Sequence, residues 1–261
     1  MNLCVDINAD IGPWAFRRLP QYSVRGVLDM MDQWGIHRAL AGPVQGITYR
    51  NCHAANQELA EELDAVPGVR ERILPAAVLN PRYPGALDDL SACITSLGCR
   101  ALKLYPNYHG YRAWESECVE LCRAATDAGL PVLLVVRVED ERFHHWQLLV
   151  PPTPLEDFLK LVEEVPGGKF VLVGCNAAEA RRCLAEAGEG AQVWVDLSYV
   201  KSPMRATQAI VNECGSARLL FGTHMPFVYP AVNCDKIRRA DIGAEDLAAI
   251  LGGNAAAVLG L

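Results

Sequence analysis

The sequence predicts an α/β fold, a single-domain (β/α)8 TIM barrel over residues 1–261, and three observations support this. Eight short apolar runs alternate with helical patterns along the whole chain. These runs are apolar on both faces, which is typical of parallel strands covered on both sides. The length is close to the roughly 250 residues of such barrels, and no linker interrupts it. An open doubly wound sheet is the alternative, but no glycine-rich phosphate loop follows the first strand.

The elements follow in order from these runs. Strands are predicted at residues 3–7, 38–42, 73–79, 101–105, 132–138, 170–174, 192–197 and 218–221. Helices are predicted at residues 24–34, 50–65, 86–97, 116–128, 155–165, 177–187, 204–214, 230–239 and 244–259. Gly35, Gly98, Gly129 and Gly188 each end a predicted helix shortly before a strand, where a left-handed C-cap is needed. The short connections suit right-handed crossovers.

Composition narrows the class of protein. The chain is 51% apolar and 21% charged, as expected for a folded globular domain. A net charge of −7 argues against nucleic acid or an anionic membrane as partner. No leader peptide or membrane-length apolar run is visible, so we expect a cytoplasmic protein with its ten cysteines reduced. Trp114 and Trp146 fall in expected rim loops, where they could line a pocket or a homo-oligomer contact.

Polar residues gather where the predicted strands end. Active sites of these barrels lie at the C-terminal ends of the strands. The candidates there are Asn8 and Asp10 after the first strand, Lys103 in the fourth with His109 beyond it, Arg137 and His145 around the end of the fifth, Asn176 after the sixth, Asp196 in the seventh and His224 after the eighth. Barrel cores are filled by Val, Ile and Leu and do not need imidazoles, so this clustering indicates a functional site.

Each candidate also has a structural interpretation. An unpaired Lys103 inside an apolar strand would be costly, so it is paired, with Asp10 or Asp196, or faces a polar site. Asp196 could therefore be a partner of that lysine rather than a base. His224 could cap a loop carbonyl, and Asn176 could bond the backbone of a turn.

Five segments carry a resemblance to a known family. They are residues 6–13, residues 101–106 with His109, residues 131–134, residues 220–227 and residues 250–255. Together they resemble the amidohydrolase-related family, in the branch that contains decarboxylases and lactonases of the aminocarboxymuconate-semialdehyde decarboxylase type. The resemblance covers the whole chain and implies a TIM barrel that usually holds a catalytic metal.

The resemblance also implies where the metal ligands should stand. The family's first-strand histidine pair corresponds to Asn8 and Asp10, and its fifth-strand histidine to Val135 or Val136. The sixth-strand histidine falls at residues 174–176, and the aspartate after the eighth strand corresponds to His224. Valine cannot ligate a metal, so several ligands are lost together.

The favoured hypothesis is an amidohydrolase-like hydrolase, or a related lactonase or decarboxylase, that acts on a small carboxylate-bearing substrate without the family's metal. Asp10, Lys103, His109 and His224 are the expected catalytic residues, and Asn8, Arg137, His145, Asn176 and Asp196 the expected substrate-binding residues. Lys103 and Arg137 would orient a carboxylate, His224 or Asp10 would act as base, and His109 as acid or oxyanion donor.

Two alternatives stay open. One is a rebuilt site for a divalent metal such as Zn²⁺ that includes Asp10 and His224, completed by His109 or Cys175. The other is a barrel that binds a carboxylate or lactone ligand without catalysis. No further cofactor is predicted.

Overall fold

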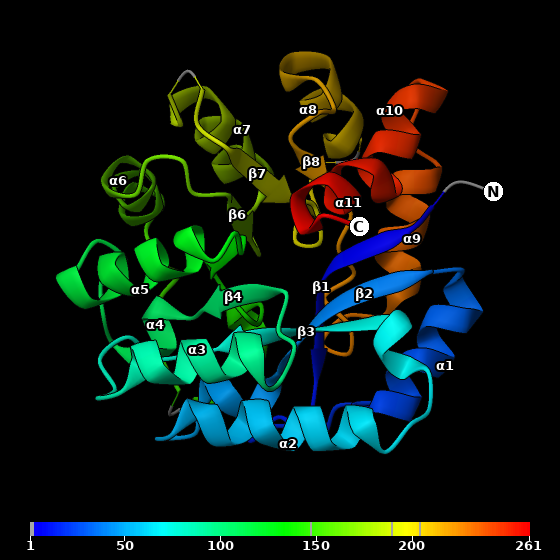
Figure 1. Cartoon of the computed structure of the whole chain (residues 1–261). Coiled ribbons are helices and arrows are strands. Elements are labelled where there is room, and N and C mark those ends of the chain that lie inside the picture. Colours follow the sequence, from blue (N-terminus) through cyan, green and yellow to red (C-terminus); the bar gives the residue numbers. More distant parts are fainter. Residues whose placement is uncertain (1–2, 147, 189, 204) are drawn as a thin grey trace.

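The computed structural model describes residues 3–146, 148–188, 190–203 and 205–261, and it confirms the predicted barrel. Eight parallel strands are bonded in chain order, and helices surround them (Figure 1). The strands are β1 (Val5–Ile11), β2 (Arg38–Pro43), β3 (Ile73–Val78), β4 (Ala101–Leu104), β5 (Val132–Val135), β6 (Phe170–Val173), β7 (Val193–Asp196) and β8 (Leu219–Leu220). Backbone bonds from Ile7 N to Phe221 O (3.0 Å) and from His224 N to Asn8 O (2.8 Å) join the last strand to the first.

The outer layer consists of the helices that follow the strands. They are α1 (Val24–Trp34), α2 (Cys52–Asp64), α3 (Ala86–Thr95), α4 (Pro106–His109), α5 (Ser116–Asp127), α6 (Leu155–Glu164), α7 (Ala177–Glu186), α8 (Ala206–Cys214), α9 (Pro230–Arg238), α10 (Ala244–Ala248) and α11 (Asn254–Leu259). Short 3₁₀ turns lie at Val44–Ile47, Val69–Glu71 and Glu141–Phe143, and a π turn, Ala249–Gly253, joins the last two helices. The predicted helix at 204–214 is α8, and Met204 lies outside the described residues.

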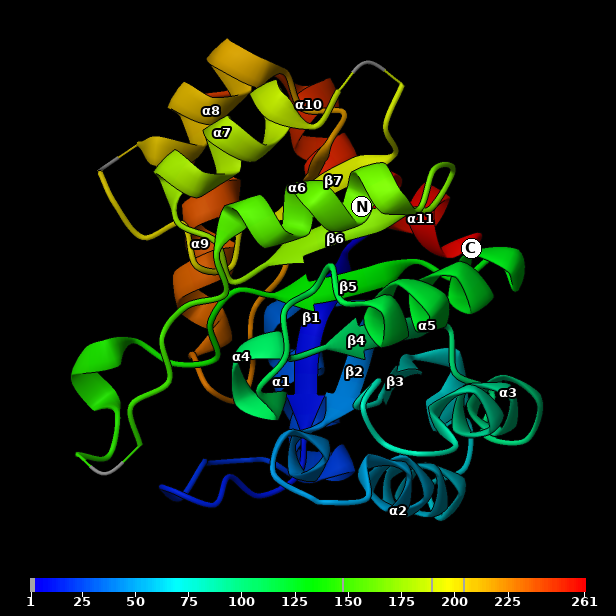
Figure 2. The ribbon, with the colours of Figure 1, turned by 90° about the vertical axis from the view of Figure 1, so that its left-hand side faces the viewer.

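Two apolar clusters form the core. The outer one packs the helices against the outside of the strands, and the inner one fills the barrel. Ala255, Val258 and Leu259 of α11 join Val5 and Ile7 in the inner cluster, so the C-terminal helix closes the end where the strands begin. Figure 2 shows α11 at one end of the barrel and the long loop between β5 and α6 at the other.

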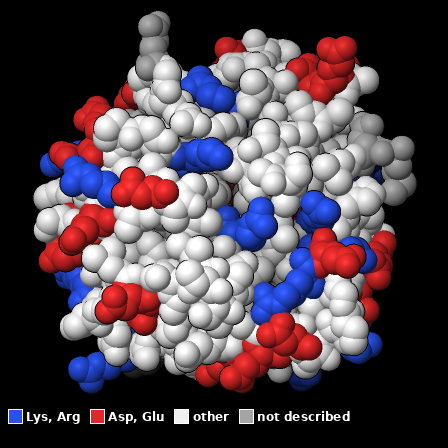
Figure 3. All heavy atoms as spheres, viewed as in Figure 1, with Lys and Arg blue, Asp and Glu red and all other residues white. Residues whose placement is uncertain are grey.

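The closed end carries charges of both signs. Figure 3 shows lysine and arginine side chains interspersed with aspartate and glutamate over this face. No helix in the described part of the chain is both long and apolar enough to cross a membrane.

The extent of β1 is the main correction to the predicted elements. The strand was expected to end at Ile7, with Asn8 and Asp10 in the following loop. It runs instead from Val5 to Ile11, and all seven residues are buried. Both polar side chains therefore belong to the barrel wall, where their polar groups need partners.

Candidate functional site

A β-bulge in β1 turns Asn8 and Asp10 toward the barrel interior. Asp6 pairs with Ala39 and Ala9 pairs with Ala41, so β1 uses one residue more than β2 over this interval. Ile7 packs in the inner apolar cluster, and Asn8 reaches polar groups inside the barrel. Without the extra residue, the strict alternation of a strand would send these neighbours to opposite faces.

The carboxylate of Asp6 holds the bulge in place. It accepts hydrogen bonds from the backbone N–H of Asn8 (2.9 Å) and of Thr223 (3.0 Å), and from the Thr223 hydroxyl. Asp6 is fully buried, and this burial raises its pKa to about 6, against the opposing effect of the three hydrogen bonds.

Seven side chains form what we call the inner polar cluster: Asn8, Asp10, Lys103, Tyr105, Asp196, Ser198 and His224. The Lys103 ammonium lies at its centre and donates to Asp10 Oδ1 (2.7 Å), to Asn8 Oδ1 (2.9 Å) and to Ala9 O (3.4 Å). Tyr105 also donates to Asp10 Oδ1 (3.2 Å). Because Lys103 and Asp10 are only 2% and 1% exposed, they stabilise each other as a desolvated ion pair.

Asn8 connects this pair to β7. Its Nδ2 donates to Asp196 Oδ2 (3.1 Å) and to Ser198 Oγ (3.2 Å), while its Oδ1 accepts from Lys103. Ser198 in turn donates to Asp196 from its hydroxyl and its backbone N–H. Of the two partners considered for Lys103, the structure selects Asp10.

His224 stands between the cluster and the outside of the barrel. Its Nδ1 lies 3.4 Å from Asn8 Nδ2 and 3.6 Å from Asp10 Oδ2, and its Nε2 bonds the carbonyl of Val138. Burial lowers the pKa of His224, so the neutral ring donates from Nε2 and accepts at Nδ1. The residue has a φ of +57°, and its ring stacks on Phe227 with centroids 5.0 Å apart. Such a left-handed backbone is uncommon for a side-chain-bearing residue and is typical of functional sites.

A pocket of about 230 Å³, here called the mouth pocket, opens above His224. It is lined by Arg17, Val138, Glu139, Asp140, Tyr199, Lys201, His224, Phe227 and Val228. Among the members of the inner polar cluster, His224 is the one that lines it.

The charges around the mouth pocket are mostly paired. Arg17 bonds Glu139 (2.6 Å), and Arg142 bonds Asp140 (2.7 Å). Lys201 lies over the Tyr199 ring at 4.0 Å and only 3.8 Å from the Asp140 carboxylate that Arg142 already occupies. Of the two cations that line the pocket, Arg17 and Lys201, Lys201 thus makes the longer contact with a carboxylate.

Four of the expected site residues lie away from the inner polar cluster. Arg137 binds Glu179 through two bonds (2.6 and 2.7 Å) and Gly174 O, and Asn176 caps the start of α7. His109, on α4, bonds Gly46 O (3.1 Å) through Nε2, and burial lowers its pKa. His145 is exposed in the loop after β5, beside Trp146. Their functional roles remain predictions.

Sequence reasoning placed Asn8, Asp10, Lys103, Asp196 and His224 in one site, and the structure brings these five together. The sequence prediction did not include the other two members of the inner polar cluster, Tyr105 and Ser198, or the charged wall of the mouth pocket. Tyr105 and Ser198 stand at strand ends, so position alone could have indicated them. Arg17 comes from the loop before α1, and nothing in its local sequence signals the contact with Glu139.

The residues present do not fit a metal centre. Asn8 Oδ1 and Asp10 Oδ1 are bonded to the Lys103 ammonium, and Asp10 Oδ2 lies 3.6 Å from His224 Nδ1. Val135 packs in the inner apolar cluster, and Cys175 points to Leu172 O and Asp196 O, with burial raising its thiol pKa well above the usual value. Within the described ranges, no group of three or more His, Cys, Asp or Glu side chains is arranged to hold a metal ion.

Comparison with known families identifies the class of protein. The profile of a family described as amidohydrolase matches residues 11–261. The chain therefore belongs to the amidohydrolase family, which confirms the resemblance seen in the sequence. No curated protein matches it.

Solved structures share the fold at low identity. A 5-carboxyvanillate decarboxylase from Sphingomonas paucimobilis superposes with a TM-score of 0.75 at 16% identity, covering 100% of both chains. A dihydroxybenzoic acid decarboxylase from Polaromonas sp. JS666, with bound manganese, gives 0.73 at 15% identity, covering 100% of this chain and 98% of that one. A probable 2-pyrone-4,6-dicarboxylic acid hydrolase from Acinetobacter baumannii gives 0.70 at 13% identity, covering 100% of both.

Proposed function

We propose that this protein is a metal-independent enzyme of the amidohydrolase family that decarboxylates or hydrolyses a small, single-ring carboxylate in the mouth pocket. The observation that carries the proposal is the position of His224. It joins the buried Asp10–Lys103 pair on one side to the mouth pocket on the other.

The chemistry follows from the two nitrogens of His224. Asp10 and Asn8 fix the ring from the Nδ1 side, while Nε2 bonds Val138 O in the pocket wall. When a bound substrate replaces Val138 O and the ring takes its Nδ1–H tautomer, with that proton facing Asp10, Nε2 can take a proton from the substrate and return it later, and the Asp10 carboxylate stabilises the imidazolium that forms. The buried Lys103 ammonium, on the far side of His224 from the pocket, supplies a fixed positive charge to the site without a metal.

The mouth pocket indicates the size and charge of the substrate. Its volume of about 230 Å³ lies below the usual range of roughly 300–1,000 Å³ for ligand pockets, which favours a single ring or less. Lys201 would anchor the substrate carboxylate, with Arg17 beside it. The decarboxylases and the probable pyrone-dicarboxylate hydrolase among the similar structures have names that refer to single-ring carboxylates, which supports this class.

The test is a screen of 2,6-dihydroxybenzoate, 5-carboxyvanillate and 2-pyrone-4,6-dicarboxylate in the presence of a chelator, with product analysis. His224→Gln keeps a donor for Val138 O but cannot take up a proton, so kcat should fall by about 10²–10⁴. His53→Gln, at the start of α2, is the matched control and should leave kcat unchanged. Equal rates for wild type and His224→Gln would remove His224 from the mechanism.

One observation favours a second candidate function, a ligand-binding barrel without catalysis. Asn8, Asp10, Lys103 and Asp196 are each no more than 2% exposed and satisfy one another's hydrogen bonds. Such a barrel would be stabilised by a carboxylate ligand in a thermal melt, by RT ln(1 + [L]/Kd), yet would show no turnover. Turnover of any bound ligand would rule this candidate out.

A further inference from the structure

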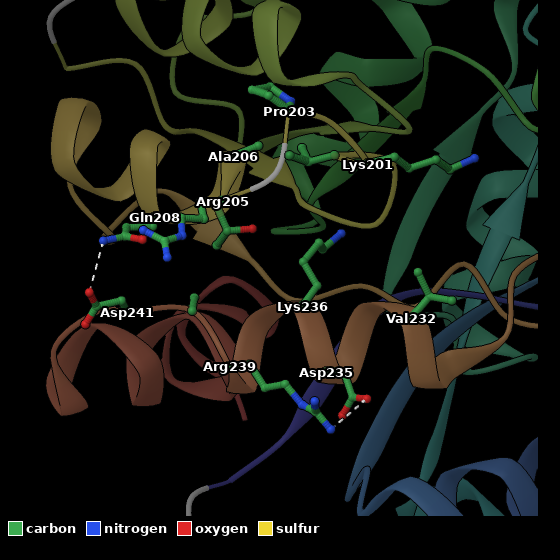
Figure 4. A pocket seen from close by; sticks show the side chains of 13 residues that line it. Lys201, Pro203, Arg205, Ala206, Gln208, Val232, Asp235, Lys236, Arg239 and Asp241 are labelled. Carbon is green, nitrogen blue, oxygen red and sulfur yellow. Dashed lines mark hydrogen bonds and ion pairs between the residues drawn. The ribbon is translucent and has the colours of Figure 1, made fainter.

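A second and larger pocket lies outside the barrel, between α8 and α9. We call it the α8–α9 groove. It measures about 610 Å³ and is lined by the start of α8, by α9 and by the segments before α8 and after α9 (Figure 4). This volume lies within the roughly 300–1,000 Å³ of small-molecule sites. The inner polar cluster contributes nothing to its walls.

Both carboxylates of the groove are already engaged. Asp235 pairs with Arg239 (3.4 Å), and Asp241 accepts from Gln208 Nε2 (3.4 Å). Figure 4 shows the Asp235–Arg239 pair on the side of α9 away from Ala206, whereas Lys236 rises from α9 toward that residue. The lining holds four cations, Lys201, Arg205, Lys236 and Arg239, against these two acids, so its net charge is positive.

Lys236 is the central one of these cations. Its ammonium donates to Leu197 O and to Asn233 Oδ1 (2.6 Å), which leaves one of its three N–H groups for a ligand. Burial lowers the pKa of Lys236 to about 8, so the group is still mainly charged at pH 7. An anion beside it would replace the water that the amine has lost.

The opposite wall is the first turn of α8, where two polar groups make no bond to another described residue. Arg205 precedes the helix with a left-handed φ of +66°, and its guanidinium has no hydrogen-bond or ion-pair partner among the described residues. Thr207 is 2% exposed, and its hydroxyl has no hydrogen-bond partner in the described part of the chain. The start of a helix also carries partial positive charge, which favours an anion there.

We propose that the α8–α9 groove is a second binding site, for an organic anion with an aromatic or aliphatic body. The anionic group lies between Lys236 and the first turn of α8, where Arg205 can reach it. The body packs on the apolar lining, to which Val200, Pro203, Ala206 and Val232 contribute. This site is separate from the mouth pocket, with which it shares Lys201 alone.

The test is a fluorescence titration of the full chain with 1-anilinonaphthalene-8-sulfonate, an aromatic sulfonate, under native conditions checked by circular dichroism. Lys236→Met removes the central cation, and Val232→Glu places a negative charge at an exposed position in the groove. Each should raise Kd at least about tenfold. Because Lys236 also holds Leu197 O, the exposed Val232 variant keeps the test valid if Lys236→Met does not fold.

Three controls locate the probe. Leu149→Glu and Lys160→Met make the same chemical changes at exposed positions outside the groove and should leave Kd unchanged, as should His224→Gln in the mouth pocket. 2-Naphthoate should displace the probe, and inorganic phosphate at the same concentration should not. The proposal would be overturned if Val232→Glu bound the probe with the wild-type Kd. It would also be overturned if His224→Gln weakened probe binding, or if phosphate displaced the probe as well as 2-naphthoate does.

Discussion

At the scale of single residues, the main feature of the site is a buried ion pair, Lys103 with Asp10. Lys103 is held by oxygens of Asn8, Ala9 and Asp10, and Tyr105 adds a further bond to the same carboxylate. A buried ion pair of this kind contributes little net stability by itself, but removing one partner leaves the other charge unpaired. The interior of this barrel therefore depends on keeping both.

Lys103→Met should destabilise the protein by about 3–5 kcal/mol, because Asp10 then stays buried without its cation. Urea unfolding measures the change. The double variant Lys103→Met with Asp10→Asn removes both charges and should recover part of the loss. Lys160→Met, an exposed control on α6, should stay within about 0.5 kcal/mol of wild type. A loss below about 1 kcal/mol for Lys103→Met would contradict the buried pair.

Asp6 makes stability depend on pH in a defined window. Its pKa rises from 3.8 to about 6 on folding because the carboxyl is fully buried. The native state thus holds this proton more tightly than the unfolded chain. This tighter proton binding stabilises the native state by about 3 kcal/mol below about pH 4. The stabilisation is lost as pH rises through 6.

Asp6→Asn isolates this contribution. Unfolding free energies of both proteins at pH 4.5 and pH 7 give the measurement, and wild type should lose stability relative to the variant as pH rises. His224, whose pKa is lowered by burial, acts in the opposite sense in both proteins and cancels in the difference. A difference that does not change with pH would show that Asp6 titrates normally.

At the scale of elements, the bulge in β1 and the close approach of β8 position the site together. The bulge turns Asn8 inward, and the segment after β8 passes close enough to place His224 beside it. Gly222 makes this approach possible, since a Cβ there would lie 2.2 Å from Asp196 Oδ1 and 3.1 Å from Asn8 Cβ. The separation of 2.2 Å from Asp196 Oδ1 is far shorter than van der Waals contact.

Gly222→Ala should therefore destabilise the protein by roughly 1–3 kcal/mol and weaken the contacts of Asp196. Gly253→Ala is the matched control, because its Cβ would meet only Ala248 O at 3.5 Å and its backbone is helical. That control should be neutral or slightly stabilising. Thermal melts of the two variants give the comparison, and equal melting temperatures would mean that β8 can move away without cost.

At the scale of the whole molecule, barrel closure brings β1, β4, β7 and β8 to one point. The inner polar cluster draws its members from these four strands and the segments that follow them. An ammonium from β4 bonds the first-strand side chains that the family resemblance assigns to metal binding. A cation of the chain itself thus lies beside the side chains that the resemblance assigns to metal binding.

Manganese or zinc added to chelator-treated protein should shift Tm by less than about 1 °C, because a ligand that does not bind the native state adds nothing to its stability. Differential scanning calorimetry with and without metal is the measurement, together with elemental analysis of protein purified without chelator. A near-stoichiometric metal and a rise of several degrees would show that the site rearranges around an ion.

The sequence by itself determined the barrel, because apolar runs of strand length alternating with helical patterns have few other solutions. It also placed Asn8, Lys103 and His224 at one end of that barrel, since parallel strands bring their C-terminal ends together. Local patterns carry this information without knowledge of distant contacts.

Only the tertiary structure decided what these residues touch. The bulge depends on Asp6 meeting Thr223, which is distant in sequence, and the choice of Asp10 over Asp196 as partner of Lys103 depends on barrel register. Arg137 and Asn176 were expected at the site, but one pairs with Glu179 and both help to fix the start of α7. Side-chain direction and long-range pairing determine these contacts, and the spacing of residues along the chain predicts neither of them.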